Sequence, residues 1–379
     1  MSLKQTISQY WEKIQGTLFP ILAEALPPLT QKQQQLVSIL EILRIEEFVF
    51  SACPGFRGRP EKSRRAILRA FVAKAVYNMT TTRMLLERLH SDVSFRKICG
   101  FELRNEIPSE SVFSRAFAEF AATELLIHVH AELIKTHYKN EIVGHVITDS
   151  SAIQSREKAA KKAKEVVVNK PKNPGGRPRK GQEKPKEMTR IEKQASGVMS
   201  LEKMLKDLPQ QCDVGAKKNT KGNLEWWIGY KLHITVDDHG IPLAGILSSA
   251  SLNDNQVAIP LGILTAQRVT SLYDLMDAAY YAPGIIEHSK KLGHVPIIER
   301  PAERGKTEEK QQEKLAWSTL NWKPAEMVRF EKRTTIERSF SRLKDQFGAR
   351  SVRVRGSAKV FTHLMFGVLA LSVDQLLRI

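Results

Sequence analysis

The sequence has few cysteines and no long apolar run. Its three cysteines among 379 residues, Cys53, Cys99 and Cys212, lie far apart in the chain. So few cysteines exclude a disulfide framework and a cysteine zinc site, and they are typical of a reducing cytoplasm. No run reaches the roughly 18 apolar residues of a membrane helix, and the opening MSLKQTISQYWEKIQG lacks a signal peptide's apolar stretch. We therefore expect a cytoplasmic protein that is not in the membrane.

Acidic residues are also scarce relative to basic ones. The chain has 59 Lys and Arg against 41 Asp and Glu, a formal net charge of +18. A chain this basic attracts polyanions, and nucleic acid is their usual form. Its length allows two or three domains, each with a core.

Residues 1–140 carry apolar residues at helical spacing in several segments separated by polar turns. We expect an all-α domain here that binds DNA or supports a dimer. Two of its short helices, joined by a tight connection, resemble a helix-turn-helix. A plain helical bundle would have the same pattern.

From residue 141 to residue 379, strands alternate with helices. Apolar runs predict strands in GHVITDSSAI, WWIGYKLHITV, IPLAGILSSAS, SLYDLMDA and VPIIERP. Helices are expected between the later strands, over residues 257–267 and 283–292. This order predicts an α/β domain with a mixed sheet and flanking helices.

A basic segment, residues 156–193, interrupts this sheet. It holds ten Lys, four Arg and five Glu, so its net charge of +9 is half that of the chain. With few apolar residues it predicts a flexible insertion. Arg177 and Arg179, in GGRPRKG, resemble an AT-hook core that lies in a narrow minor groove. A solvated linker has the same composition, and either would attract DNA.

Three acids occupy positions where α/β folds place their sites. Asp149 is expected at the end of the first strand and Asp277 after the fourth, so both would reach one sheet edge. Glu337, on a later helix, could pack across that edge. Asp274 competes with Asp277, which is favoured because it follows the apolar run and precedes small residues. One such acid more often caps a turn, but three together can hold two Mg²⁺ ions.

The stretch FEKRTTIERSFSRLKDQFG, residues 330–348, predicts one helix. At 100° per residue, Phe330, Arg333, Glu337 and Lys344 share a stripe about 60° wide beside an apolar face. An Arg333–Glu337 ion pair explains part of the stripe, but cation before acid is the less favourable order at this spacing. A catalytic carboxylate flanked by phosphate-binding cations explains it better.

The spacing Phe330-x2-Arg333-x3-Glu337-x6-Lys344 resembles the Y-x2-R-x3-E-x6-K signature of bacterial insertion-sequence DDE transposases, with Phe in place of Tyr. VITDSSAI and LMDAAYYAP resemble the strands that carry the family's first and second acids. The helical segment upstream is similar to the domain that precedes the catalytic domain in many of these enzymes. The resemblance covers most of residues 55–370.

The resemblance implies an RNase H-like fold and an enzyme that depends on two Mg²⁺ (or Mn²⁺) ions. Such an enzyme nicks DNA at transposon ends and joins the freed 3′-OH to target DNA. Asp149, Asp277 and Glu337 would be its catalytic metal ligands. Arg333 and Lys344 would contact DNA phosphates.

Three aromatic residues have less certain counterparts in the family. Phe330 lacks the Tyr hydroxyl but keeps a ring that can pack. Trp317 and Trp322 occupy the segment from which some relatives hold an unstacked base. Packing is the alternative role for both tryptophans.

Three functions fit these observations. One is a transposase that binds terminal inverted repeats, cleaves there and transfers the ends. Another is an RNase H-like nuclease without strand transfer, and the third is a transposase-derived DNA-binding protein without catalysis. The intact acid triad argues against the third. Because transposition holds two ends together, we expect a homodimer on DNA.

Overall fold

The structure is a computed structural model that describes residues 28–49, 62–160, 188–218, 222–300, 312 and 324–379. Most of the basic insertion, with Arg177 and Arg179, lies outside the described residues. Trp317 and Trp322 lie outside them as well. The predictions for these four side chains therefore stay predictions.

Before residue 140, the secondary structure of the described residues consists of helices and 3₁₀ turns, as predicted. Capping side chains start several of them: Thr30 accepts from the Gln33 amide before α3, and Ser63 accepts from the Ala66 amide before α4. The helices are α3 (Gln31–Leu43), α4 (Arg64–Val76), α5 (Thr82–Ser91), α6 (Val93–Ile98), α7 (Glu110–Ala122) and α8 (Leu125–His137), with 3₁₀ turns η1 (Ile45–Phe48) and η2 (Arg104–Glu106). The helix-turn-helix interpretation stays a prediction.

A six-stranded mixed sheet follows, which confirms the predicted α/β class. Its strands are β1 (Ile142–Gln154), β2 (Asp213–Lys218), β3 (Leu224–Val236), β4 (Pro242–Ser249), β5 (Thr270–Met276) and β6 (Val295–Ile298). β1, β5 and β6 run parallel, whereas β3 is antiparallel to β1, β2 and β4. Three long antiparallel strands continued by two parallel ones form a sheet consistent with the RNase H-like fold.

The two faces of the sheet carry different helices. On one face, Ile147 and Ile234 join a core with Ile336 and Phe340 of α15 (Thr334–Gln346). On the other, Thr235 hydrogen-bonds to Thr265 of α11 (Asn255–Ala266). The shorter elements are α9 (Arg190–Ala195), α10 (Leu201–Asp207), η3 (Ala278–Tyr280), α12 (Pro283–Lys291) and α14 (Ala325–Glu331).

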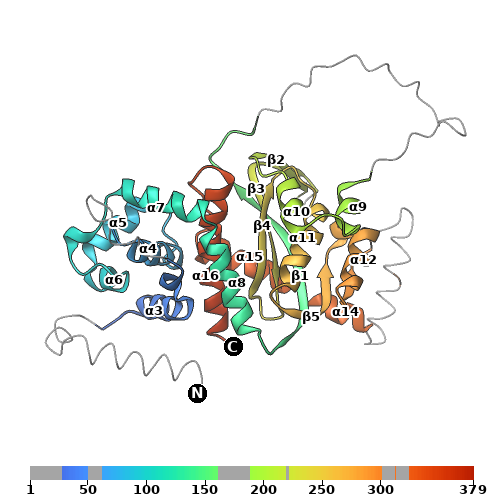
Figure 1. Cartoon of the computed structure of the whole chain (residues 1–379), viewed down its shortest axis with the longest axis horizontal. Coiled ribbons are helices and arrows are strands. Elements are labelled where there is room, and N and C mark those ends of the chain that lie inside the picture. Colours follow the sequence, from blue (N-terminus) through green and yellow to red (C-terminus); the bar gives the residue numbers. More distant parts are fainter. Residues whose placement is uncertain (1–27, 50–61, 161–187, 219–221, 301–311, 313–323) are drawn as a thin grey trace, which may run out of the picture.

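The last helix, α16 (Ser357–Leu376), lies between the helical region and the sheet (Figure 1). It packs against α3, α4, α7 and α8 as well as β4 and α15. By length and mean hydropathy it could cross a membrane, but 72% of its apolar window is buried inside the protein. Helical region and sheet thus share a hydrophobic core, and a domain boundary near residue 140 stays a prediction.

The structure differs from the predictions at three places. β2 was not expected, because its sequence DVGAKK has no apolar run. α9 begins at Arg190, inside the segment predicted to be a flexible insertion; a Thr189 capping box starts it, and it packs on α11 and α12. Residues 330–348 form two helices, because the chain turns between Glu331 and Thr334.

Candidate active site

Asp149 and Asp277 come together because their strands are parallel neighbours. The pairing of β1 with β5 ends at Thr148 and Met276, so each acid follows directly after the last paired residue. Asp277 then opens the η3 turn by accepting from the Ala279 amide at 3.0 Å. The prediction that Asp149 ends its strand is wrong, because β1 continues along β3 to Gln154.

Both carboxylates lie in surroundings that disfavour their charge. Burial raises the pKa of Asp149 to about 6. The Ser150 amide, 2.7 Å away, and Arg333 oppose this rise, whereas Asp277 adds to it. Burial also raises the pKa of Asp277, again against Arg333. The two acids therefore place their negative charges close together, and Arg333 is a compensating cation beside them.

Arg333 connects the two acids to helix α15. Its Nη1 lies 3.8 Å from Asp149 Oδ2, and its Nη2 lies 3.1 Å from Glu337 Oε1. The Glu337 side chain is 57% exposed, so it faces solvent beside the half-buried Asp149. The structure thus brings Asp149, Asp277, Arg333 and Glu337 to one place.

Phe330 supports Arg333 from the preceding helix. Its ring packs against the core, and its centroid lies 5.8 Å from the Arg333 guanidinium carbon. A cation above an aromatic face is attracted by the ring and does not need a phenol hydroxyl. The Phe330 ring therefore packs within the folded protein, and its part in DNA binding stays a prediction.

The turn before Arg333 is held by contacts that the sequence did not suggest. Lys332 Nζ donates to Asp238 Oδ1 at 2.9 Å, and the same carboxylate binds the ring and amide of His145. Arg329 lies over the Tyr273 ring, 4.5 Å from its centroid. These contacts tie α14 and the turn after it to β1 and β5, next to Arg333.

Lys344 lies two helical turns beyond Glu337 and reaches the same strand. Its Nζ donates to Ser151 Oγ at 2.7 Å, two residues from Asp149. Burial lowers its pKa, and Lys217 and Arg350 lower it further. A cation thus contacts β1 two residues from Asp149, and its contact with a DNA phosphate stays a prediction.

The structure distinguishes Asp277 from Asp274, the other candidate for the second acid of the site. Asp274 points to the other face of the sheet, where Ser289 and His294 hydrogen-bond to its carboxylate. It is therefore structural, and Asp277 is the acid of this strand that faces Arg333. Asp254, held by Lys231 at 3.0 Å, is close enough to raise the pKa of both Asp149 and Asp277.

Tyr280 is a residue of the site that sequence reasoning missed. Its side chain is fully buried, and its hydroxyl makes no well-formed hydrogen bond among the described residues, although the Ser150 side chain is near enough to lower its pKa. Burial and the charges of Asp254, Asp149 and Asp277 raise its pKa far above the ordinary value. Its position three residues after Asp277 was a signal that could have been used.

The donors available for a metal ion are carboxylate oxygens. Within the described part of the chain, no three His, Cys, Asp or Glu side chains are close enough together to hold an ion. Asp149 and Asp277 nevertheless fit a hard divalent cation, because their half-buried carboxylates follow neighbouring strands and supply oxygen ligands. Glu337 is linked to them through Arg333.

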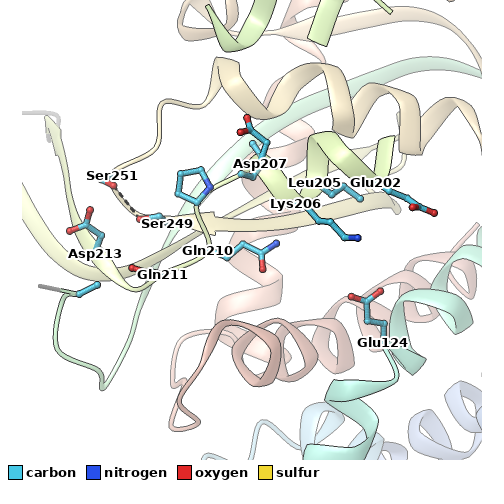
Figure 2. Close-up of a pocket in the computed structure, with 13 residues that line it drawn as sticks. Glu124, Glu202, Leu205, Lys206, Asp207, Gln210, Gln211, Asp213, Ser249 and Ser251 are labelled. Carbon is cyan, nitrogen blue, oxygen red and sulfur yellow. Dashed lines mark hydrogen bonds between the residues drawn. The ribbon is translucent and has the colours of Figure 1, made fainter. Parts of the chain in front are cut away.

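A separate pocket lies between α10, the start of β2 and the junction of α7 with α8 (Figure 2). None of the three acids of the site lines it. Its charged residues are one cation, Lys206, and four acids: Glu124, Glu202, Asp207 and Asp213. This excess of negative charge disfavours DNA there.

Two family models match the chain. "Transposase DDE domain" matches residues 189–373, and "Transposase domain (DUF772)" matches residues 22–119. The first includes Asp277 and Glu337 but begins after Asp149, beyond the basic segment. No curated protein and no solved structure matches the chain.

Proposed function

We propose that this chain binds the terminal inverted repeats of its element, cleaves there and transfers the 3′-OH ends into target DNA. The chain belongs to the DDE transposases of insertion sequences. The observation that supports this most is the meeting of Asp149 and Asp277 beside Arg333 and Glu337. It gathers the residues of the family signature from distant segments. We expect the enzyme to act in the bacterial cytoplasm, on the nucleoid.

The family generally uses divalent metal ions, and we propose two Mg²⁺ (or Mn²⁺) ions here. Asp149, Asp277 and Glu337 would hold them. Bound ions of this kind activate the attacking oxygen and stabilise the leaving one in phosphodiester chemistry. Oxygen-only donors suit Mg²⁺ better than a histidine or cysteine cage would.

The chain's own residues prepare the site in other ways. Arg333 is a planar cation that can leave a carboxylate for a phosphate, since guanidinium matches both in geometry. Lys344, which donates to Ser151, would supply a second cation for the phosphates of bound DNA.

The proposal is tested by incubating the protein with element-end DNA, target DNA and Mg²⁺. Joined product supports the transposase. Cleavage without joining would indicate a nuclease, and binding alone would indicate a non-catalytic DNA-binding protein. Because two ends must be held together, we also propose a homodimer on the DNA, which the mass of the complex would reveal.

A further inference from the structure

The connection between α15 and α16 is built to present arginines. Along residues 347–356, apolar side chains turn inward while basic ones turn outward. The buried residues are Phe347, Ala349 and Val352, and the exposed ones are Arg350, Arg353 and Arg355. A loop with this alternation is attached to the core and has one cationic side.

This loop is fixed at several points. The Phe347 carbonyl oxygen lies so close to Gly367 of α16 that a Cβ there would be 2.5 Å away, so only glycine allows the approach. The His363 ring lies 3.1 Å from the Gly348 carbonyl oxygen, and the Gly356 amide donates to Glu157 at 2.9 Å. The arginines therefore extend from a positioned backbone.

One end of the cationic side lies at the candidate active site. Lys344 donates a hydrogen bond to Ser151. Lys217 on β2 and Arg350 on the loop are close enough for their charges to lower the pKa of Lys344. Arg350 is paired with Asp345, and Lys217 is exposed. Three cations from three elements thus lie near Ser151 of β1, which is two residues after Asp149.

The other end reaches the helical region. Arg353 is near Lys74 of α4; burial first, and then Arg353, lowers the pKa of Lys74 to about 8. Arg353, Arg355 and the exposed Lys359 have no ion-pair partner among the described residues. Glu157, whose carboxylate accepts from the Gly356 amide, is the second residue of the basic segment.

We propose that these residues form a track for the phosphate backbone of duplex DNA, leading from the catalytic carboxylates to the helical region. The basic track comprises Lys217, Lys344, Arg350, Arg353, Arg355 and Lys359. Like charges held together repel one another in the free protein, and a polyanion removes that repulsion. The pocket beside α10, with its four acids, cannot serve the same partner. The inference rests on the proposed function and adds the DNA path.

The test measures binding of a mixed-sequence DNA duplex over a range of salt, without divalent metal so that no cleavage occurs. The variant carries Arg353→Gln and Arg355→Gln. Each lost phosphate contact lowers the slope of log affinity against log salt by about 0.9, so the double variant should lose about 1.8. A second variant, Arg355→Gln with Lys359→Gln, avoids Lys74 and gives the same expectation if the first is unstable.

The matched control carries Lys203→Gln and Lys290→Gln, two exposed lysines on α10 and α12. It makes the same change in net charge and should keep the wild-type slope. An unchanged slope in both loop variants, or an equal fall in the control, would overturn the track. If the wild-type protein failed to bind duplex at all, the proposed function itself would be wrong.

Discussion

The guanidinium of Arg333 lies 3.8 Å from the Asp149 carboxylate, so helix α15 and strand β1 meet through an ion pair at the candidate site. The same guanidinium holds Glu337. In the free protein it offsets negative charge, and with DNA bound it is placed to meet a phosphate. Because the guanidinium would bind a carboxylate or a phosphate in turn, its planar geometry should matter as well as its charge.

Arg333→Lys should slow cleavage by about 10²-fold, because lysine keeps the charge but lacks the planar fork that joins two oxygens. Single-turnover cleavage of end DNA measures the effect. Arg338→Lys, at an exposed position next to Glu337 on the same helix, is the control and should be near wild type. Wild-type cleavage by Arg333→Lys would mean that charge alone suffices.

Tyr280→Phe should stabilise the protein by about 1 kcal/mol, because it removes a buried hydroxyl that makes no well-formed hydrogen bond, even to the nearby Ser150 side chain. Urea unfolding gives the difference. Tyr281→Phe, at a position 39% exposed, should change little. A loss of stability in Tyr280→Phe would show that the hydroxyl has a partner in the folded protein.

His294 should make stability depend on pH. Its hydrogen bond to Asp274 raises its pKa above the ordinary value. The stabilisation is therefore complete below the unfolded pKa of about 6.5 and is lost as the pH rises through the folded pKa. His294→Gln should lower the free energy of unfolding more at low pH than at high pH.

Unfolding measured across this pH range, beside His128→Gln at an exposed position on α8, checks the expectation for His294. The control should show no such trend. If His294→Gln loses the same stability at every pH, the imidazole is a neutral hydrogen-bonding partner.

Much of the site could be predicted from local pattern. Asp277 follows an apolar run, and that run is a strand, so its position was readable. The spacing of Arg333, Glu337 and Lys344 on a helix was readable too, and α15 carries the last two. Local periodicity decides both features.

Other features depend on contacts between distant segments. The turn at Lys332 has no glycine or proline, and Asp238, 94 residues away, holds it. Asp274 and Asp277 could not be separated until β5 was paired and its faces were assigned. β2 lacks an apolar run and forms because β3 offers it an edge. None of these is encoded in a short window of sequence.

The DNA contacts expected of the basic segment and of the two tryptophans stay predictions. Deleting residues 161–187 should weaken DNA binding and flatten its salt dependence, because the segment is strongly cationic. A salt titration of the deletion variant measures this. An unchanged slope would mean that the segment does not touch DNA.

The central claim is that Asp149, Asp277 and Glu337 act together on DNA. The most direct measurement compares wild-type protein with Asp149→Asn, Asp277→Asn and Glu337→Gln in cleavage and joining of end DNA with Mg²⁺, alongside DNA binding. Each variant should bind DNA but give no cleaved or joined product. Normal turnover by any one of the three would remove that acid from the active site.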